Sequence, residues 1–291
     1  MDINYELYKV FYYVASTLSF SEAAKQLYIS QSAVSQSVKA LEKKLGLTLF
    51  IRSTKKVCLT PEGETLLRHV EPAVRLISRG EAQLIDTSFG SGQLRIGASD
   101  TICRYFLVPY LEKFHNTFPR THIKVTNASS IRCAELLESG QVDLIVVNYP
   151  NPYLKNIPSV KCIKSFQDVF IANESFRGLK GKKLTYRQLL DYPILMLDKR
   201  STTSEFLHSL FQQHQLDLVP EAELSSNDLL IDLAGIGLGL AFIPDYCMEQ
   251  MPDGLFVVEM KEKLPKRELA ISYNSYLPVS RATEEFLSYF E

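Results

Sequence analysis

The stretch "SQSAVSQSVKALEKKLG", residues 30–46, has the apolar spacing of a helix and an unusual polar surface. Val34, Val38, Leu41 and Leu45 recur three or four residues apart, which places them on one face of a helix. The other face carries Ser and Gln, although Ser is a poor residue for a helix interior because its hydroxyl competes for backbone hydrogen bonds. This pattern raises the question of what the polar face contacts.

The segments on both sides of this helix predict a helix-turn-helix with a wing. The helical pattern "SFSEAAKQL" (residues 19–27) precedes it, and only the short turn "YIS" (residues 28–30) separates the two. Two helices joined by so short a turn form a helix-turn-helix. After it, "LTLFIRSTKKVCLT" (residues 47–60) alternates apolar and polar residues around a basic turn, which predicts a two-stranded hairpin.

The charge of this first segment favours a polyanionic partner. Residues 1–60 contain eight Lys or Arg and four acidic residues, a net charge of +4, whereas the whole chain carries −1. On the predicted helix, Ser32, Gln36, Lys39 and Lys43 repeat the apolar spacing on the opposite side. Hydroxyls and amides can pair with base edges, and ammonium groups suit phosphates. The alternative is a solvated helix that tolerates Ser and Gln.

A long helix and a linker are expected next. Thr60, Pro61 and Glu62 form a helix start, and the helical pattern continues to about residue 88. The segment is mostly polar with one apolar stripe, so we expect it to pair with a second copy of the chain. Pro72 is expected to kink it, because proline removes one backbone hydrogen bond. "SFGSGQ" (residues 88–93) predicts a linker.

Beyond the linker, strand and helix patterns alternate in two rounds, which predicts a largely parallel sheet covered by helices. The fold class is therefore α/β overall, with two similar lobes around a cleft. The expected domains are a winged helix-turn-helix at 1–60, a linker helix at 61–88 and an effector-binding domain at 89–291. Lobe I is expected at about 92–162 and 268–291, and lobe II at about 163–267.

The first part of the chain resembles the winged helix-turn-helix domain of LysR-type transcriptional regulators. The resemblance rests on "SF…AA..L..SQSAVS..VKALE..LG..LF.R" and "LTPEGE", within about 60 contiguous residues, and the rest of the chain also looks like this family. It implies a periplasmic-binding-protein-like effector domain. It also implies a homo-oligomer, usually a dimer of dimers, that binds a double-stranded DNA operator, responds to a small molecule and acts on RNA polymerase.

The resemblance also implies which residues contact DNA. Residues matching the recognition helix approach bases in the major groove, and those matching the wing reach the backbone or minor groove. The expected DNA-binding residues are Gln31, Ser32, Ser35, Gln36, Lys39, Arg52, Ser53, Lys55 and Lys56. Many family members carry Arg where this chain has Gln36, so an amide contact to adenine is favoured here over an arginine contact to guanine.

Small hydroxyl residues follow several strand patterns and precede helices. Helix N-termini have spare N–H groups, so such turns can hold an anion or a polar group, although each is also an ordinary helix cap. The family pattern implies effector contacts at Ser99, Thr101, Asn127, Ser129, Ser201, Thr202 and Thr203. We expect a small polar or anionic metabolite and no cofactor. Asp100 lies beside the first of these turns, and its carboxylate could repel an acid or pair with an amine. An amino acid or another zwitterion is therefore an alternative effector.

Three other classes of protein fit the sequence less well. An enzyme is disfavoured because "GIGLG" (Gly235–Gly239) follows a helix rather than a strand, and the five histidines form no triad or metal pattern. A solute-binding protein shares the two-lobed fold but would need a signal peptide. A redox sensor would use Cys103 or Cys133, which follow helix starts where a thiol pKa can be lowered. No cysteine framework, zinc motif or membrane span is expected, so we predict a cytoplasmic protein.

Overall fold

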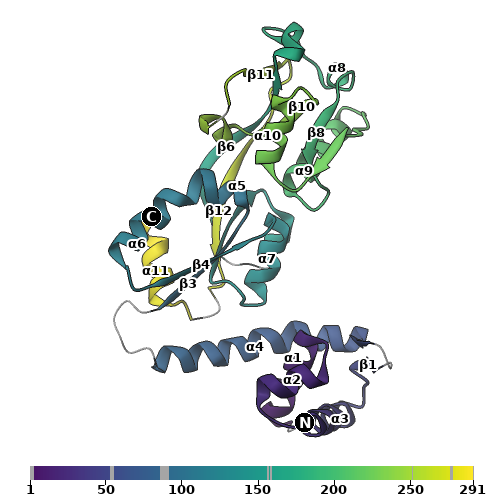
Figure 1. Ribbon diagram of the computed structural model, residues 1–291, viewed down its shortest axis with the longest axis vertical. Helices are drawn as coiled ribbons and strands as arrows, with labels where there is room; N and C mark the ends of the chain where they lie inside the picture. The colour runs from purple at the N-terminus through teal and green to yellow at the C-terminus, as the bar shows by residue number, and fades with distance from the viewer. Residues whose placement is uncertain are drawn as a thin grey trace. The chain divides into compact units, whose positions relative to one another are not determined.

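The computed structural model describes residues 3–52, 56–85, 92–155, 157, 159–250, 252–275 and 278–290. The chain forms two compact units, Met1–Thr87 and Ser88–Glu291, each of which is described by itself (Figure 1).

The N-terminal unit is a winged helix-turn-helix followed by a long helix. Its elements are α1 (Tyr5–Thr17), α2 (Phe20–Leu27), α3 (Gln31–Leu45), β1 (Phe50–Arg52), β2 (Val57–Leu59) and α4 (Pro61–Ile85). Strands β1 and β2 pair antiparallel, as expected for the wing.

Local signals explain where the first helices begin and end. The side chains of Asn4, Ser19 and Ser30 each accept a backbone N–H of the helix that follows, so all three act as N-caps. Helix α3 ends at Gly46, which has a φ of 70° and closes the helix in the left-handed conformation. The predicted short turn between α2 and α3 is therefore confirmed.

The apolar stripe of α3 packs into the core of this unit. Val34, Val38 and Leu41 are fully buried with residues of α1 and α2, whereas Leu45 at the end of the stripe is only half-buried. The apolar spacing therefore predicted the buried face correctly, except at its last turn.

The first half of α4 belongs to this same core. Thr60 caps the helix through Gly63 N–H (3.0 Å), and Val70 and Val74 are 7% and 3% exposed against the three-helix core. Part of the apolar stripe is thus buried within the unit itself, and the pairing of this helix with a second copy of the chain stays a prediction. Ile77 is 42% exposed, and the helix continues through Pro72 to Ile85.

The C-terminal unit is built on a mixed sheet of ten strands within the described residues. Its order is β4-β3-β5-β12-β6-β10-β8-β9, and β11 joins β6 to β7. The strands are β3 (Gln93–Ala98), β4 (His122–Asn127), β5 (Leu144–Tyr149), β6 (Ser159–Asn173), β7 (Lys183–Leu184), β8 (Ile194–Leu197), β9 (Ala222–Leu224), β10 (Leu240–Pro244), β11 (Leu255–Met260) and β12 (Lys266–Tyr273).

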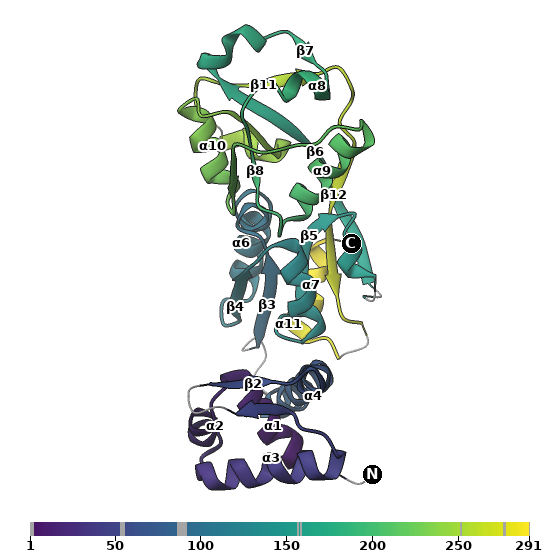
Figure 2. The same ribbon diagram turned by 90° about the vertical axis from the view of Figure 1, so that its right-hand side faces the viewer.

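Helices cover both faces of each half of this sheet. Those used below are α5 (Asp100–Ile102), the π-helical turn η1 (Cys103–Leu107), α6 (Val108–Thr117), α7 (Ser130–Glu138), α8 (Tyr186–Leu189), α9 (Thr202–Gln213), α10 (Asn227–Gly235) and α11 (Arg281–Leu287). The short 3-10 helices are η2 (Pro152–Leu154), η3 (Glu174–Leu179), η4 (Asp245–Gln250) and η5 (Ser288–Phe290). In lobe I, helices α6 and α11 lie on one face and α7 on the other (Figures 1 and 2).

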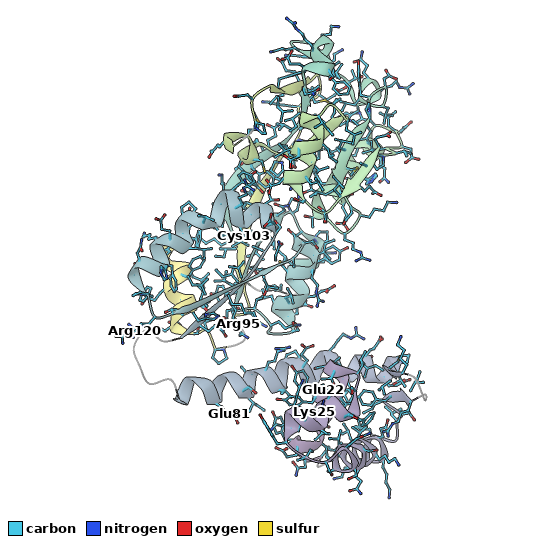
Figure 3. The ribbon with its side chains drawn as sticks, in the orientation of Figure 1. Glu22, Lys25, Glu81, Arg95, Cys103 and Arg120 are labelled. Carbon is cyan, nitrogen blue, oxygen red and sulfur yellow. The ribbon has the colours of Figure 1, made fainter. Side chains whose placement is uncertain are left out.

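Alternating side chains explain this layering. Leu144 and Val146 of β5 pack with the helices α6 and α11, while Ile145 and Val147 pack with α7. At the edge of lobe I, the Arg95 guanidinium pairs with the Asp143 carboxylate at 2.7 Å, and Figure 3 labels Arg95 on β3.

The expectation of a largely parallel sheet is only half right. Strands β3, β4 and β5 are parallel in lobe I, and β8, β9 and β10 are parallel in lobe II. The long strand β6 pairs antiparallel with β12 over Ser159–Gln167, then antiparallel with β10 from Asp168 onward. Because β6 and β12 cross between the lobes, they cannot follow the parallel strand-helix-strand repeat.

The contact between α4 and the wing gives a test of this packing. A methyl group on Gly63 would lie 2.3 Å from the Leu49 carbonyl oxygen, whereas one on Gly80 of the same helix would meet nothing within 4 Å. Gly63→Ala should destabilise the N-terminal unit by about 1–3 kcal/mol. Gly80→Ala should stabilise it by about 0.5–1 kcal/mol, because alanine restricts the unfolded chain. Native-state hydrogen exchange of α3 measures both, and equal effects would contradict this packing.

Candidate functional sites

The polar face of α3 is exposed along its length. Gln31, Ser32, Gln36 and Lys39 are all exposed, and they lie opposite the buried stripe. The Gln31 amide oxygen accepts the Ser21 hydroxyl at 3.1 Å, which ties the first turn of α3 to α2. The amide of Gln36 and the ammonium of Lys39 form no such bond within the described part of the chain, so both are available to a partner.

Ser35 and Arg52 contact each other within the unit. The Arg52 guanidinium donates to Ser35 Oγ at 3.2 Å and lies 3.6 Å from a Glu42 carboxylate oxygen. Its carbon Cζ lies 4.5 Å from the centre of the Phe20 ring, a cation–π contact. Arg52 therefore joins the wing strand β1 to α2 and α3.

Glu42 connects α3 to the wing, a contact that sequence reasoning missed. Its second carboxylate oxygen accepts the backbone N–H groups of Leu49 (2.8 Å) and Phe50 (3.3 Å). One side chain thus holds the start of the wing and the Arg52 guanidinium against α3. The sequence feature that could have pointed to this contact is Glu42 itself, a single acidic residue in a helix whose other charged residues are lysines. Ser53 and Lys55 lie outside the described residues, and Lys56 is exposed.

A cavity of about 910 Å³ lies between the two lobes of the C-terminal unit. Five of the seven predicted effector residues line it: Ser99, Thr101, Asn127, Ser129 and Ser201. Thr202 and Thr203 are not among the lining residues, because they are 4% and 2% exposed in the first turn of α9 behind the wall. The volume suits a small ligand.

The sheet topology explains why these residues meet. The segments that line the cavity follow the carboxyl ends of the parallel strands β3, β4, β8 and β9, two in each lobe. Parallel strands present their carboxyl ends at one edge, where open α/β sheets bind ligands. Four helices therefore begin at the cavity, with the N-caps Ser99, Ser129, Ser201 and Ser226.

These four serines are helix caps and also cavity residues. Each hydroxyl oxygen accepts a backbone N–H of its own helix. A serine hydroxyl that accepts in this way still has its own hydrogen to donate. The caps and the free N–H groups of the first helical turns therefore present donors to a ligand.

Polar contacts join the two lobes beside the cavity. One set links the helix starting at Asp100 to α10: the Asn227 amide donates to Thr101 Oγ1 (2.8 Å) and the Tyr105 hydroxyl donates to Asp228 (2.6 Å). A second set reaches α9: the Asn148 amide donates to Thr203 Oγ1 (3.3 Å) and the Tyr153 hydroxyl to Glu205 (3.1 Å). Side chains of the cavity region thus form hydrogen bonds from one lobe to the other.

A buried ion pair lies where the long strands cross between the lobes. Arg267 of β12 and Asp168 of β6 are 2% and 0% exposed, and Nη1 donates to Asp168 Oδ2 at 2.9 Å. The same nitrogen donates to Thr203 Oγ1 at 3.1 Å, so the pair is continuous with the contact to Asn148. Burial raises the pKa of Asp168, and the adjacent guanidinium opposes this increase. Sequence reasoning missed this pair.

The surroundings of Cys103 and Cys133 disfavour the redox alternative. Figure 3 shows Cys103 on the helix that begins at Asp100. Burial raises the pKa of the Cys103 thiol to about 11 and that of Cys133 to about 12, so desolvation outweighs the lowering expected at a helix start. Neither cysteine lines the cavity.

Within the described ranges, no three His, Cys, Asp or Glu side chains are placed to hold a metal ion. The helices of the same ranges include none that is long and apolar enough to cross a membrane.

The chain matches two family models. Residues 5–64 match "Bacterial regulatory helix-turn-helix protein, lysR family", and residues 88–291 match "LysR substrate binding domain". A "Probable RuBisCO transcriptional regulator" of Phaeodactylum tricornutum is 28% identical over 94% of this chain and 91% of its own. The "HTH-type transcriptional activator CmpR" of Synechocystis is 25% identical over 97% of this chain and 93% of its own.

Solved structures share the fold. A full-length single-residue variant of OxyR from Pseudomonas aeruginosa has a TM-score of 0.72 at 20% identity, covering 99% of this chain and 94% of that one. Full-length CbnR, solved with its target DNA, has a TM-score of 0.66 at 17% identity over 99% of both chains. The regulatory domain of Synechocystis CcmR, solved with 2-PG, has a TM-score of 0.62 at 22% identity over 68% of this chain and 95% of that one.

The buried ion pair predicts a strongly destabilised single variant. Arg267→Met leaves the Asp168 carboxylate buried without its cation, which should cost about 3–5 kcal/mol. The double variant Arg267→Met/Asp168→Leu removes both charges and should recover most of that loss. Hydrogen exchange of the β6 and β12 amides measures the free energy of unfolding. A double variant as unstable as Arg267→Met would show that the charge pairing is not the cause.

The raised pKa of Cys103 predicts slow thiol chemistry. The thiolate is the reactive form, and its pKa of about 11 compares with 9.0 for an ordinary thiol. At pH 7, alkylation by iodoacetamide should therefore be about 100-fold slower in the folded protein than in urea, rising about tenfold for each pH unit. Peptide-resolved mass spectrometry measures the rates, and similar rates in both states would restore the redox alternative.

Proposed function

Because the chain belongs to the LysR family of DNA-binding transcriptional regulators, we propose that α3 reads its operator and that the cavity between the lobes binds its effector. The protein is a LysR-type regulator with an effector-binding domain. The observation that carries the proposal for DNA is the exposed polar face of α3 opposite a fully buried stripe.

The residues of this face have distinct proposed roles. Gln31, Ser32 and Gln36 lie toward the N-terminal end of α3, the part of a recognition helix that contacts bases. The Gln36 amide has the donor and acceptor that adenine requires, and the Lys39 ammonium suits a phosphate. Ser35 is half-buried and holds Arg52, so we assign this pair to placing the wing as well as to contacting the DNA backbone, together with Ser53, Lys55 and Lys56.

The cavity is proposed to take a small polar or anionic effector. Ser99, Thr101, Asn127, Ser129 and Ser201 would contact it directly, because they line the cavity and sit at or near helix starts. Thr202 and Thr203 would act from behind the wall, where Thr203 links Asn148 to Arg267. The structure of the CcmR domain with 2-PG supports a small-molecule effector for this fold.

The assembly is proposed to be a dimer of dimers in the cytoplasm. The second half of α4 supports this, because Ile77 is an exposed apolar residue on a helix whose first half is already buried. We propose RNA polymerase as the further partner and assign no enzymatic activity.

Two variants separate base reading from phosphate binding. Gln36→Ala should relax the base preference at one operator position. The binding free energies of the preferred base and the other bases at that position should become closer by about 1–3 kcal/mol. Lys39→Ala should weaken binding to all sequences about equally and reduce the slope of log affinity against log salt by about one. Binding-site selection followed by salt titration measures both effects.

The proposal fails in two distinguishable ways. An unchanged base preference in Gln36→Ala would exclude base reading by that residue. A wild-type protein that selects no sequence over competitor DNA would refute operator recognition by α3.

A further inference from the structure

We propose that the effector is a small zwitterion of the amino-acid type, with its carboxylate at the start of α9 and its ammonium at Asp100. This inference rests on the proposed function of the cavity, and it names the chemical class of the ligand.

The unpaired charges around the cavity are the first observation. Asp100 in lobe I and Lys199 and Arg200 in lobe II line the cavity, and their side chains form no ion pair with any residue that the structure describes. Among the other charged lining groups, Arg132 and Glu135 pair with each other, whereas Glu205 and Asp198 accept only neutral donors, the Tyr153 hydroxyl and the Arg200 backbone N–H. Three carboxylates (Asp100, Asp198 and Glu205) and two cations (Lys199 and Arg200) without an ion pair among the described residues therefore line the cavity, and this excess of negative charge favours a ligand that carries a positive group.

The cationic end suits a carboxylate. Lys199 and Arg200 immediately precede Ser201, which caps the helix α9 (Thr202–Gln213). The spare N–H groups and the dipole of this helix add partial positive charge where the two side chains already contribute full charges. A carboxylate placed here would receive donors from the Ser201 turn.

The other end needs a hydrogen-bond donor from the ligand. Asn227 lines the cavity and is 5% exposed, and its side-chain oxygen has no partner although its amide nitrogen donates to Thr101. Asp100 precedes Thr101 and lines the same cavity, so a carboxylate from lobe I and an unpaired amide oxygen from lobe II belong to the same end of it. A buried acceptor without a donor is costly, and an ammonium group would satisfy it.

A ligand carrying only acidic groups fits this arrangement less well. A dicarboxylate offers acceptors alone at neutral pH, so it would leave the Asn227 oxygen unpaired. It would also bring a second negative charge toward Asp100, which is repulsive. A zwitterion matches both ends, and its two groups would join lobe I to lobe II. The cavity volume of about 910 Å³ also leaves room for a side chain.

Matched ligands test the inference in the full-length protein. Each of the twenty standard amino acids is screened by thermal shift, and each ligand that raises the melting temperature is titrated by calorimetry beside its 2-hydroxy acid, such as serine beside glycerate or aspartate beside malate. At least one amino acid should bind, and its hydroxy acid should bind at least about tenfold more weakly, because it lacks the charge-assisted hydrogen bond to Asp100.

Two charge variants complete the test. Asp100→Asn should weaken binding of the amino acid at least about tenfold and leave that of the hydroxy acid nearly unchanged. Asp191→Asn, which removes an exposed acid outside the cavity, should change neither.

The outcomes separate this inference from the function on which it rests. Binding of 2-PG, inorganic phosphate or hydroxy acids without binding of any amino acid would overturn the zwitterion and retain the effector cavity. Equal binding of an amino acid and its hydroxy acid would also overturn it. If none of these probes binds, both the zwitterion and the proposed cavity function are contradicted.

Discussion

The ion pair between Arg267 and Asp168 is the constraint on which the C-terminal unit depends. Both groups are fully enclosed at the point where β6 and β12 leave one lobe and enter the other. Removing two charges from water is costly, so the pair is stable only while both strands hold it in register. Since Arg267 also binds Thr203, and Thr203 binds Asn148, the crossing point and the cavity wall form one polar network. The crossing of the long strands is therefore linked through hydrogen bonds to the wall of the cavity.

Helix caps and parallel strands place the cavity at the end of this network. Each lobe supplies two parallel strands whose carboxyl ends lead into capped helices, so donors collect at one edge without any unusual backbone conformation. The side chains that line the cavity also bind across it, as Thr101 and Asn227 show. Cavity lining and lobe contact therefore use the same residues, so a molecule in the cavity that competed for these groups would alter how the lobes meet.

The sequence predicted features that depend on local patterns. The helical pattern at 19–27, the short turn at 28–30 and the helix start at Thr60–Glu62 are all set by neighbouring residues, and the structure confirms them. The first half of β6 was missed, because "SVKCIKSF" has too many polar residues to read as a buried strand. The contacts of Glu42 and Arg267 were missed because their partners lie far along the chain or on another element. Thr203 was predicted to contact the effector together with Ser201, because both are hydroxyl residues in the same short segment. Only the structure shows that Ser201 lines the cavity and that Thr203 is buried behind its wall.

The contact between Arg52 and α3 has a consequence for how the N-terminal unit associates. Ser35, Glu42 and the ring of Phe20 already restrain this long side chain before any partner arrives. A free arginine loses rotational freedom when it becomes fixed in an interface, and that entropy loss weakens binding. Here much of the loss has occurred during folding, together with the ordering of the wing strand. The wing and the recognition helix would thus meet DNA as a preorganised surface, with a smaller entropic penalty than two independently moving segments.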